Sequence, residues 1–227
     1  MSSTRGPLVI AVDGPSGSGK SSTSRAVAQR LGLRYLDTGA MYRAVTWWML
    51  EAGVDVHDAD AVAARCAEPE LVSGTDPGAP TIHVDGHDVG AAIRTGAVTG
   101  AVSPVSTVPA VRARLLDLQR AEIAAASAAG GIVVEGRDIG SVVAPDADLK
   151  VYLTADAGAR AVRRAAEEGG AGEEAVAAVR ASLLARDEID SGRATAPLTM
   201  PDGAVHLDTT PYTLEEVVDR LVALVGR

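Results

Sequence analysis

A glycine-rich segment near the start of the chain, Gly14-Pro-Ser-Gly-Ser-Gly-Lys20-Ser21, has the residue types needed to bind a nucleotide phosphate. In a G-x-x-x-x-G-K-S pattern, backbone N–H groups surround phosphate oxygens and the lysine reaches the β and γ phosphates. Lysine is rare in this chain: of the 21 basic residues, only Lys20 and Lys150 are lysines. The chain therefore places this compact, strongly hydrated cation where a phosphate group requires it. The segment predicts a binding site for a nucleoside triphosphate.

Individual residues of this segment have separate expected roles. Gly17 and Gly19 permit backbone conformations and a close approach that a Cβ atom would hinder. We expect Ser21 to be a ligand of Mg²⁺, with Asp13 as a candidate for a contact to the metal through water. The residues predicted to bind the triphosphate are Gly14, Pro15, Ser16, Gly17, Ser18, Gly19, Lys20, Ser21 and Ser22. An isolated match to this pattern can also be a glycine-rich turn, so the flanking elements decide the interpretation.

The segments on either side of the loop have the patterns that such a site needs. Leu8–Val12 is a short apolar run typical of a buried strand, and Ser22–Leu31 has the pattern of a helix. A strand, a glycine turn and a helix N-terminus aim backbone N–H groups and the helix dipole at an anion. Further strands are predicted at Arg34–Asp37, Gly131–Glu135, Leu149–Leu153 and Val205–Asp208. Helical patterns separate most of them, which predicts an α/β fold with a parallel sheet.

Two regions interrupt this alternation. Between about residues 55 and 127, Thr81–Val84 and His87–Val89 flank Asp85-Gly86, a dipeptide typical of a hairpin turn. This region is expected to form a small α/β insertion.

The second interruption follows the strand at Leu149–Leu153. Ala155–Glu168 and Glu173–Asp190 are predicted helices, separated by a glycine-rich break at residues 169–172. Beside a phosphate site, such a pair is either a mobile lid or a static pair of helices.

Charged side chains recur at positions where they share a helix face or end a strand. The candidate sets are Arg160, Arg163 and Arg164; Asp37-Thr38-Gly39; Glu135-Gly136-Arg137-Asp138; and Arg186, Asp190 and Arg193. The arginine trio is either a solvated helix face or a group that closes over a transferring phosphoryl group. The sets at residues 37–39 and 135–138 end predicted strands, and ligands bind at the carboxyl ends of parallel strands. Arg186, Asp190 and Arg193 have the i, i+4 and i+7 spacing of residues on one helix face. They either contact a ligand there or form a surface ion pair.

Composition narrows the class of protein. A length of 227 residues suits one domain with small insertions. A net charge of −9 argues against binding to nucleic acid polymers, which need a basic surface.

Cys66 is the single cysteine, so no intramolecular disulfide is possible and a reducing compartment is expected. No apolar run approaches the length of a membrane span. We therefore expect a cytoplasmic protein with no membrane partner, and a monomer.

With these motifs identified, the chain resembles the bacterial cytidylate kinases, a family of nucleoside monophosphate kinases. The resemblance spans nearly the whole length, and several motifs in the same order make it specific. They are Asp13-Gly-Pro-Ser-Gly-Ser-Gly-Lys-Ser21, Leu36-Asp-Thr-Gly-Ala-Met-Tyr-Arg43, Ile93-Arg-Thr95, Val111-Arg112, Glu135-Gly-Arg-Asp-Ile-Gly140, Arg186-Asp187 with Asp190 and Arg193, and Leu207-Asp-Thr-Thr210.

The resemblance implies a P-loop kinase core with a five-stranded parallel sheet flanked by helices. It also implies a monophosphate-binding insertion and a helical lid. The expected parts are a core of residues 1–54, 128–154 and 200–227, an insertion at 55–127, and the lid with its adjoining helix at 155–199. The implied reaction is the Mg²⁺-dependent transfer of a phosphoryl group from ATP to CMP or dCMP.

Site roles also follow from the resemblance, residue by residue. Lys20, Arg160, Arg163 and Arg164 are implied to act on the transferring phosphoryl group. The residues implied to bind CMP are Thr38, Arg43, Ser103, Arg112, Arg137, Asp138, Arg186, Asp190 and Arg193. Arginine side chains suit phosphate oxygens, and a carboxylate suits the amino group of cytosine. Pro104 departs from the family, which usually has another residue after Ser103, so the base contact is expected to be displaced.

Other classes remain as alternatives. A P-loop kinase for UMP or a small metabolite would share the loop, although a small acceptor would not need the long insertion. A switch ATPase or GTPase is a weaker alternative, because the guanine-binding Asn/Thr-Lys-x-Asp motif and the Asp-x-x-Gly switch motif are both absent from the sequence. A nucleotide sensor without catalysis would bind ATP but release no ADP in response to CMP.

Overall fold

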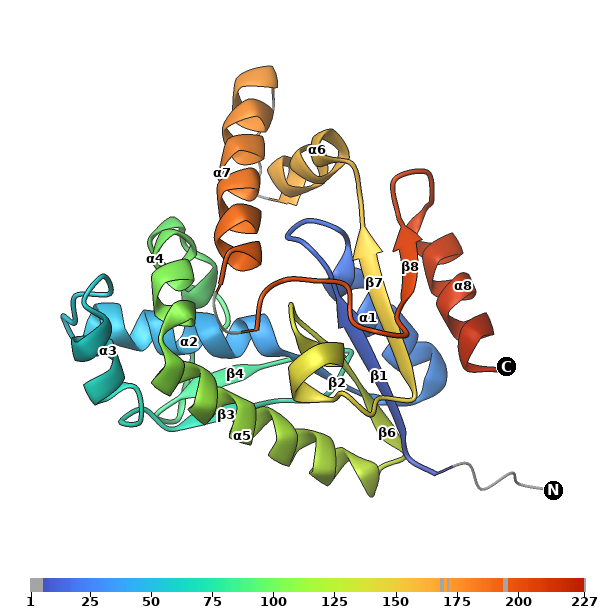
Figure 1. Ribbon diagram of the computed structural model, residues 1–227, viewed down its shortest axis with the longest axis horizontal. Helices are drawn as coiled ribbons and strands as arrows, with labels where there is room; N and C mark the ends of the chain where they lie inside the picture. The colour runs from blue at the N-terminus through green and yellow to red at the C-terminus, as the bar shows by residue number, and fades with distance from the viewer. Residues whose placement is uncertain (1–5, 168–169, 171, 194–195, 227) are drawn as a thin grey trace.

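A five-stranded parallel sheet forms the centre of the protein (Figure 1). The computed structural model describes residues 6–226 except 168–169, 171 and 194–195. The expected parallel sheet is confirmed, and its strands follow the order β2-β6-β1-β7-β8. The strands are β1 (Leu8–Asp13), β2 (Arg34–Asp37), β6 (Gly131–Glu135), β7 (Leu149–Thr154) and β8 (Val205–Asp208).

The pairing of these strands brings three acidic residues to one edge of the sheet. Val12 of β1 pairs with Glu135 of β6, and Asp37 of β2 pairs with the same Glu135. Asp13 is the last residue of β1, next to Val12. Because parallel strands all point the same way, their polar ends gather at the carboxyl edge, where ligands bind in open α/β sheets.

Helices cover both faces of the sheet. α1 (Lys20–Leu31) and α8 (Leu214–Val225) pack against each other on one face, where Val27, Tyr35 and Leu221 belong to one buried cluster. The other face carries α2 (Thr38–Glu51) and α5 (Pro109–Ser127). The sequence patterns considered above did not predict α2. Asp37 begins it as an N-cap, because its side chain accepts a hydrogen bond from the backbone N–H of Ala40 at 2.9 Å.

The insertion contains a second, antiparallel sheet of three strands. Its elements are α3 (Ala59–Arg65), β3 (Leu71–Ser73), β4 (Ile82–Val84), β5 (His87–Asp88), η1 (Ala92–Arg94) and α4 (Gly96–Thr107). The predicted hairpin is confirmed, since Asp85 and Gly86 both have positive φ angles of 50° and 79° between β4 and β5. β3 and α4 were not predicted. α4 contains two glycines and Pro104, so its helical propensity is low and burial must stabilise it.

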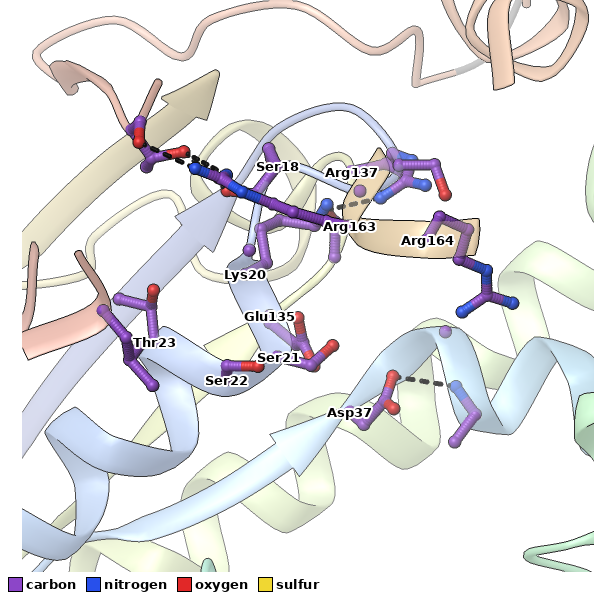
Figure 2. A pocket seen from close by; sticks show the side chains of 18 of the residues that line it. Ser18, Lys20, Ser21, Ser22, Thr23, Asp37, Glu135, Arg137, Arg163 and Arg164 are labelled. Atoms are coloured by element: carbon purple, nitrogen blue, oxygen red, sulfur yellow. Dashed lines mark hydrogen bonds between the residues drawn. The ribbon is translucent and has the colours of Figure 1, made fainter. Parts of the chain in front are cut away.

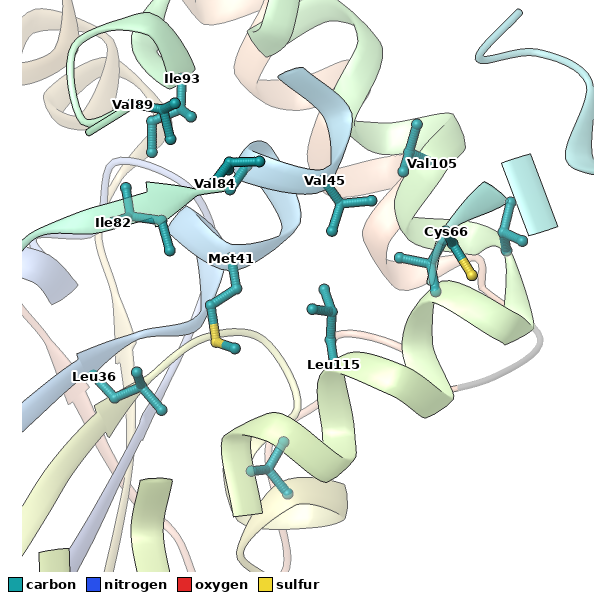
Figure 3. Close-up of a cluster of buried hydrophobic side chains, with 14 of the residues drawn as sticks. Leu36, Met41, Val45, Cys66, Ile82, Val84, Val89, Ile93, Val105 and Leu115 are labelled. Atoms are coloured by element: carbon teal, nitrogen blue, oxygen red, sulfur yellow. The ribbon is translucent and has the colours of Figure 1, made fainter. Parts of the chain in front are cut away.

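Apolar side chains join the insertion to the core. Met41 and Val45 of α2 belong to the same buried cluster as Ile82 of β4 and Leu115 of α5 (Figure 3). All four side chains are at least 96% buried. Burying such side chains contributes about 1.5–3 kcal/mol each, so the insertion and the core share one packed interior.

The second interruption is a pair of helices beside the sheet edge, α6 (Ala157–Glu167) and α7 (Glu173–Ser191), which pack on each other. Both predicted helices are confirmed. Residue 168, the predicted end of the first helix, and residues 169 and 171 of the predicted glycine break lie outside the described residues. α7 ends at Ser191, so Arg193 lies beyond it rather than on its face as expected. Between β6 and β7, η2 (Ile139–Val143) forms a single wide helical turn. No helix within the described residues is both long and apolar enough to span a membrane.

Candidate active site

The glycine-rich segment is a loop between the end of β1 and the start of α1, as expected. At Gly14, φ is 144° and an added Cβ would lie 2.0 Å from the carbonyl oxygen of Leu153, so only glycine fits. Gly19 adopts a left-handed conformation (φ 85°) and directs the chain into α1 at Lys20. The first N–H groups of a helix have no partner within it and favour anions. The loop therefore has the backbone geometry of a phosphate site.

Lys20 is buried at the base of this loop. Its Nζ donates to the carbonyl oxygen of Pro15 at 2.6 Å. Burial is the largest cause of a lowered pKa for Lys20, the Arg137 charge lowers it further, and the Glu135 carboxylate offsets part of the effect. Because Lys20 is desolvated and lies near other cations, an anionic ligand would strongly stabilise its charged form.

Glu135 is a buried carboxyl group beside Lys20 and Ser21. The Tyr35 hydroxyl donates to its Oε1 atom, and the Ser21 side chain also hydrogen-bonds to it. Burial raises the pKa of Glu135 to about 7, and the nearby Asp37 charge raises it further against the lowering effect of Lys20. Figure 2 shows Ser21, Glu135 and Asp37 on one side of the pocket, below Lys20. These oxygen atoms are of the kind that Mg²⁺ prefers.

Asp13 is held by the turn after β6. Its Oδ1 and Oδ2 atoms accept hydrogen bonds from the backbone N–H groups of Ile139 at 2.7 Å and Gly140 at 2.8 Å. Burial raises the pKa of Asp13 to about 6, although both hydrogen bonds act to lower it. The carboxylate thus orients η2 and the segment before it, which carries Arg137 and Asp138.

A pocket of about 570 Å³ opens beside the loop. Within the described residues it is lined by Lys20 and by arginines from several elements, in a protein with a net charge of −9. The lining arginines are Arg43, Arg94, Arg137, Arg163, Arg164 and Arg186. The chain therefore concentrates positive charge in one cavity, as required where anionic groups meet.

Two of the residues implied to bind CMP, Arg112 and Asp138, form a buried pair beside this pocket. Arg112 of α5 donates to Oδ2 of Asp138 at 2.5 Å, and both side chains are at least 91% buried. Burial is the main cause that raises the pKa of Asp138, against the lowering effect of Arg112. The Arg112 guanidinium also lies 5.6 Å from the ring centre of Tyr42. Ser103 is buried in α4, and Pro104 is accommodated within the same helix.

A second buried carboxylate, Asp190, joins two of the arginines implied to bind CMP, Arg137 and Arg193. Arg137 donates to its Oδ2 atom at 2.9 Å, and Arg193 donates to its Oδ1 atom. Arg137 also donates to the carbonyl oxygen of Gly14 at 3.0 Å, which links this cluster to the phosphate loop. Arg193 donates to the Ser106 hydroxyl at 3.2 Å. Tertiary packing thus unites residues from α7, α4 and the turn after β6.

The other predicted acceptor residues lie nearby. Arg43 donates to Thr99 Oγ1 at 2.9 Å, and burial followed by the charge of Arg164 lowers its pKa to about 10. Burial and then the charge of Arg137 lower the pKa of Arg186 to about 9. The Nε atom of Arg186 is buried with no hydrogen-bond partner among the described residues. Thr38 donates to the Glu135 carbonyl oxygen at 2.7 Å.

The three arginines of α6 have different surroundings. Arg160 is buried and contacts the phosphate loop, whereas Arg163 and Arg164 line the pocket. Arg163 donates to the side chain and the carbonyl oxygen of Thr209, each at 3.0 Å. Figure 2 shows Arg164 extending from α6 across the pocket toward the start of α2. The pair Arg163 and Arg164 can therefore meet a ligand in the pocket.

Comparison with known proteins establishes the family. Residues 10–227 match the sequence model of the cytidylate kinase family. This chain belongs to the cytidylate kinase family. A protein named cytidylate kinase from Streptomyces avermitilis is 57% identical over 218 residues, covering 96% of this chain and 92% of that protein. Another, from Streptomyces griseus subsp. griseus, is 56% identical over 225 residues, covering 99% and 95%.

A solved structure shares the fold at low identity. An uncharacterized protein from Eubacterium ventriosum is 11% identical, with a TM-score of 0.50, covering 96% of this chain and 98% of that one. This likeness shows the fold alone, whereas the sequence matches place the chain within the cytidylate kinase family.

Several residues in the site of this cytidylate kinase family member were not given a specific role from the sequence. Glu135 and Asp37 line the pocket, as does Arg94 of η1. Glu135 stands at the carboxyl end of its strand, so the rule that directed attention to Arg137 and Asp138 also identifies it. No such signal marks the pocket-lining residues around the start of α8, which are Tyr212, Thr213, Leu214 and Val217.

Proposed function

We propose that this protein transfers the γ-phosphoryl group of ATP to CMP and dCMP, forming ADP with CDP or dCDP. The observation that carries the proposal is the gathering of Lys20 and several arginines around one pocket beside a phosphate loop, in an acidic protein. Two phosphate-bearing substrates repel each other, and fixed cations in a cavity of low dielectric offset that repulsion. Membership of the cytidylate kinase family supports the choice of acceptor.

On the donor side, the loop amides from Gly14 to Ser22 are proposed to hold the phosphates of ATP. Lys20, Arg163 and Arg164 are proposed to stabilise the negative charge that spreads over the transferring group. The acceptor phosphate is already anionic near neutral pH, so its oxygen attacks the γ-phosphorus in line and no covalent enzyme intermediate is needed. Closure of residues 155–199 over the pocket is proposed to exclude water as a competing acceptor.

On the acceptor side, the arginines are proposed to divide the work. Arg43, Arg137 and Arg193 hold the phosphate of CMP, because guanidinium groups match phosphate oxygens. Arg186 and Asp190 approach the ribose. Ser103, Arg112 and Asp138 surround the cytosine, in an insertion proposed to comprise residues 55–127.

Mg²⁺ is the proposed metal cofactor, and the residues present suit it. Ser21, Glu135 and Asp37 supply oxygen atoms at one side of the pocket, and no group of three or more His, Cys, Asp or Glu side chains suited to a metal occurs among the described residues. This composition fits a metal that keeps water and substrate phosphates as most of its ligands. Ser21 is the proposed direct ligand, with Glu135 and Asp37 orienting water around it. Asp13 is a weaker candidate for that role, since both its oxygens accept backbone hydrogen bonds. When bound, Mg²⁺ supplies charge neutralisation between the β and γ phosphates.

The test is a coupled assay of ADP release with CMP, dCMP and UMP as acceptors, with and without a chelator. We expect turnover with CMP and dCMP that a chelator abolishes. A strong preference for UMP, or ADP release that does not depend on any monophosphate, would contradict the proposal. A cytoplasmic monomer remains our prediction, and gel filtration at assay concentrations tests the oligomeric state.

A further inference from the structure

Hydrogen bonds from both helices, α6 and α7, reach the phosphate loop at Ser16. Arg160 of α6 donates to the Ser16 carbonyl oxygen at 3.0 Å, and the Ser16 N–H donates to Oδ1 of Asp187 in α7 at 3.3 Å. Arg160 and Asp187 also contact each other, with 2.5 Å between Nη1 and Oδ2. Figure 1 shows both helices above the loop that joins β1 to α1. The N–H and the carbonyl oxygen of one loop residue are thus held by opposite ends of one ion pair.

This ion pair is well shielded from solvent. The side chain of Arg160 is 7% exposed and that of Asp187 is 18% exposed. An added Cβ at Gly17 would lie 3.2 Å from the Cβ of Arg160, so the Arg160 stem packs directly on the loop. Removing one partner of such a pair leaves the other charge buried and uncompensated. The two residues should therefore act as a unit.

Arg160 differs in this respect from its neighbours on α6. Arg163 and Arg164 are among the described residues that line the pocket, while Arg160 is not. With Asp187 beside it, Arg160 adds no net charge to the loop, and its Nη1 atom is already directed at Asp187 and Ser16. Its geometry suits it to orient the loop rather than to neutralise the transferring phosphoryl group.

We propose that Asp187 is a positioning residue for ATP, holding Arg160 against the phosphate loop so that the Ser16 peptide is fixed before ATP arrives. A loop fixed in its bound conformation loses less entropy on binding, so the pair strengthens ATP affinity. The inference rests on the proposed function only in that ATP occupies the loop; it does not depend on the identity of the acceptor.

The test is a double-mutant cycle measured by calorimetric titration of Mg-ATP without CMP. Asp187→Ala and Arg160→Ala are each expected to weaken ATP binding by about tenfold, and the double variant also by about tenfold rather than a hundredfold. Glu188→Ala removes an exposed carboxylate from the next position of the same helix and is expected to leave ATP affinity unchanged. If Asp187→Ala does not fold, Asp187→Asn, which keeps the side-chain shape, takes its place in the cycle.

Amide hydrogen exchange gives a readout that a purely structural role would not move selectively. In Asp187→Ala without nucleotide, exchange within residues 14–19 is expected to increase, while exchange in β6 stays unchanged. Additive losses in the double variant, or an Asp187 variant that binds ATP as the Glu188 variant does, would overturn the proposal. So would an Arg160→Ala variant that loses turnover while Asp187→Ala retains it, since Arg160 would then act on phosphate alone. Failure of CMP turnover in the unmodified protein would contradict the proposed function but leave this cycle interpretable.

Discussion

The proposed donor half of the site and the proposed acceptor half are built in different ways. The donor half is a run of consecutive residues, 14–22, whose geometry comes from glycine backbone angles and the start of α1. The acceptor half draws on α2, α4, α5, the turn after β6 and α7, with its members spread between Thr38 and Arg193. Backbone N–H groups bind any phosphate, so a short segment suffices for them. Selecting one acceptor needs side chains placed around its base and sugar, and distant segments must supply them.

The halves also differ in how their charges are held. The loop relies on helix N-terminal N–H groups and one buried lysine, whereas the acceptor half relies on buried carboxylates that pair with arginines. Asp138 holds Arg112, and Asp190 holds Arg137 and Arg193. Such carboxylates keep the arginines in place before substrate arrives. Damage to the donor half should therefore affect chemistry, while damage to the acceptor half should affect both acceptor use and folding stability.

The largest expected effect comes from Lys20→Ala. We predict that kcat falls by about a thousandfold, because a fixed cation that stabilises developing charge is lost. Lys150→Ala is the matched control, since Lys150 is the other lysine of the chain and donates to an exposed backbone oxygen, that of Asp202, at 3.4 Å. The measurement is ADP release, with circular dichroism to verify folding. Equal activity of the two variants would remove the loop from the catalytic site.

Asp138→Ala should impair the use of CMP without changing the binding of ATP, and so distinguish the acceptor half from the donor half. It leaves Arg112 buried without its carboxylate, so we predict that kcat/KM for CMP falls by about a hundredfold and that stability falls by about 3 kcal/mol. KM for ATP should not change. Glu68→Ala, which removes the partner of Arg65 in an exposed pair, should alter neither quantity. Steady-state kinetics and denaturant unfolding provide the measurements, and an equal rise in both KM values would count against a base-site role.

Asp190→Ala is expected to destabilise the fold about as much as Asp138→Ala, and CMP should partly reverse this loss. The variant leaves Arg137 and Arg193 near each other without a shared anion, and we predict that Tm falls by about 10 °C. If the acceptor phosphate lies between these arginines, it replaces the missing charge, so CMP should raise the Tm of the variant more than that of the unmodified protein. Thermal unfolding with and without CMP measures this. A smaller CMP shift in the variant would place the phosphate elsewhere.

The smallest effect should come from Pro104→Ala. The sequence led us to expect that Pro104 displaces a base contact, yet the structure keeps Ser103 buried within a continuous α4. We therefore predict a change in KM for CMP of at most about twofold, the size typical of substitutions that remove no buried contact. Titration of CMP at saturating ATP measures it. A much larger change would show that proline shapes the base site.

Much of the fold could be predicted because local patterns carried it. β1 and β6 are short, largely apolar runs, and the predicted positions of all five core strands agree with the structure to within a residue at each end. α2 and α4 were missed for different reasons. α2 begins directly at the end of β2 with no intervening loop, through the Asp37 cap. α4 has weak helical propensity and forms because its apolar face is buried in the insertion core.

The site could be predicted less completely, and the reason is again physical. The loop pattern located the phosphate-binding segment, and the family resemblance selected acceptor residues, whose individual roles remain predictions. Glu135 and Asp187 were left without roles, because their importance depends on neighbours distant in sequence. Glu135 meets Tyr35 and Ser21, while Asp187 meets Arg160 and the loop.

By itself, then, the sequence determined the strand–loop–helix unit around Lys20, because glycine angles, apolar periodicity and a helix start are local properties of the chain. Only the tertiary structure decided which arginines face the pocket and which are paired with carboxylates. Arg163 lines the pocket while Arg160, three residues earlier, is turned to Asp187. The strength with which an arginine interacts with a ligand depends on its burial and on the nearest opposite charge. Both are set by how distant segments pack.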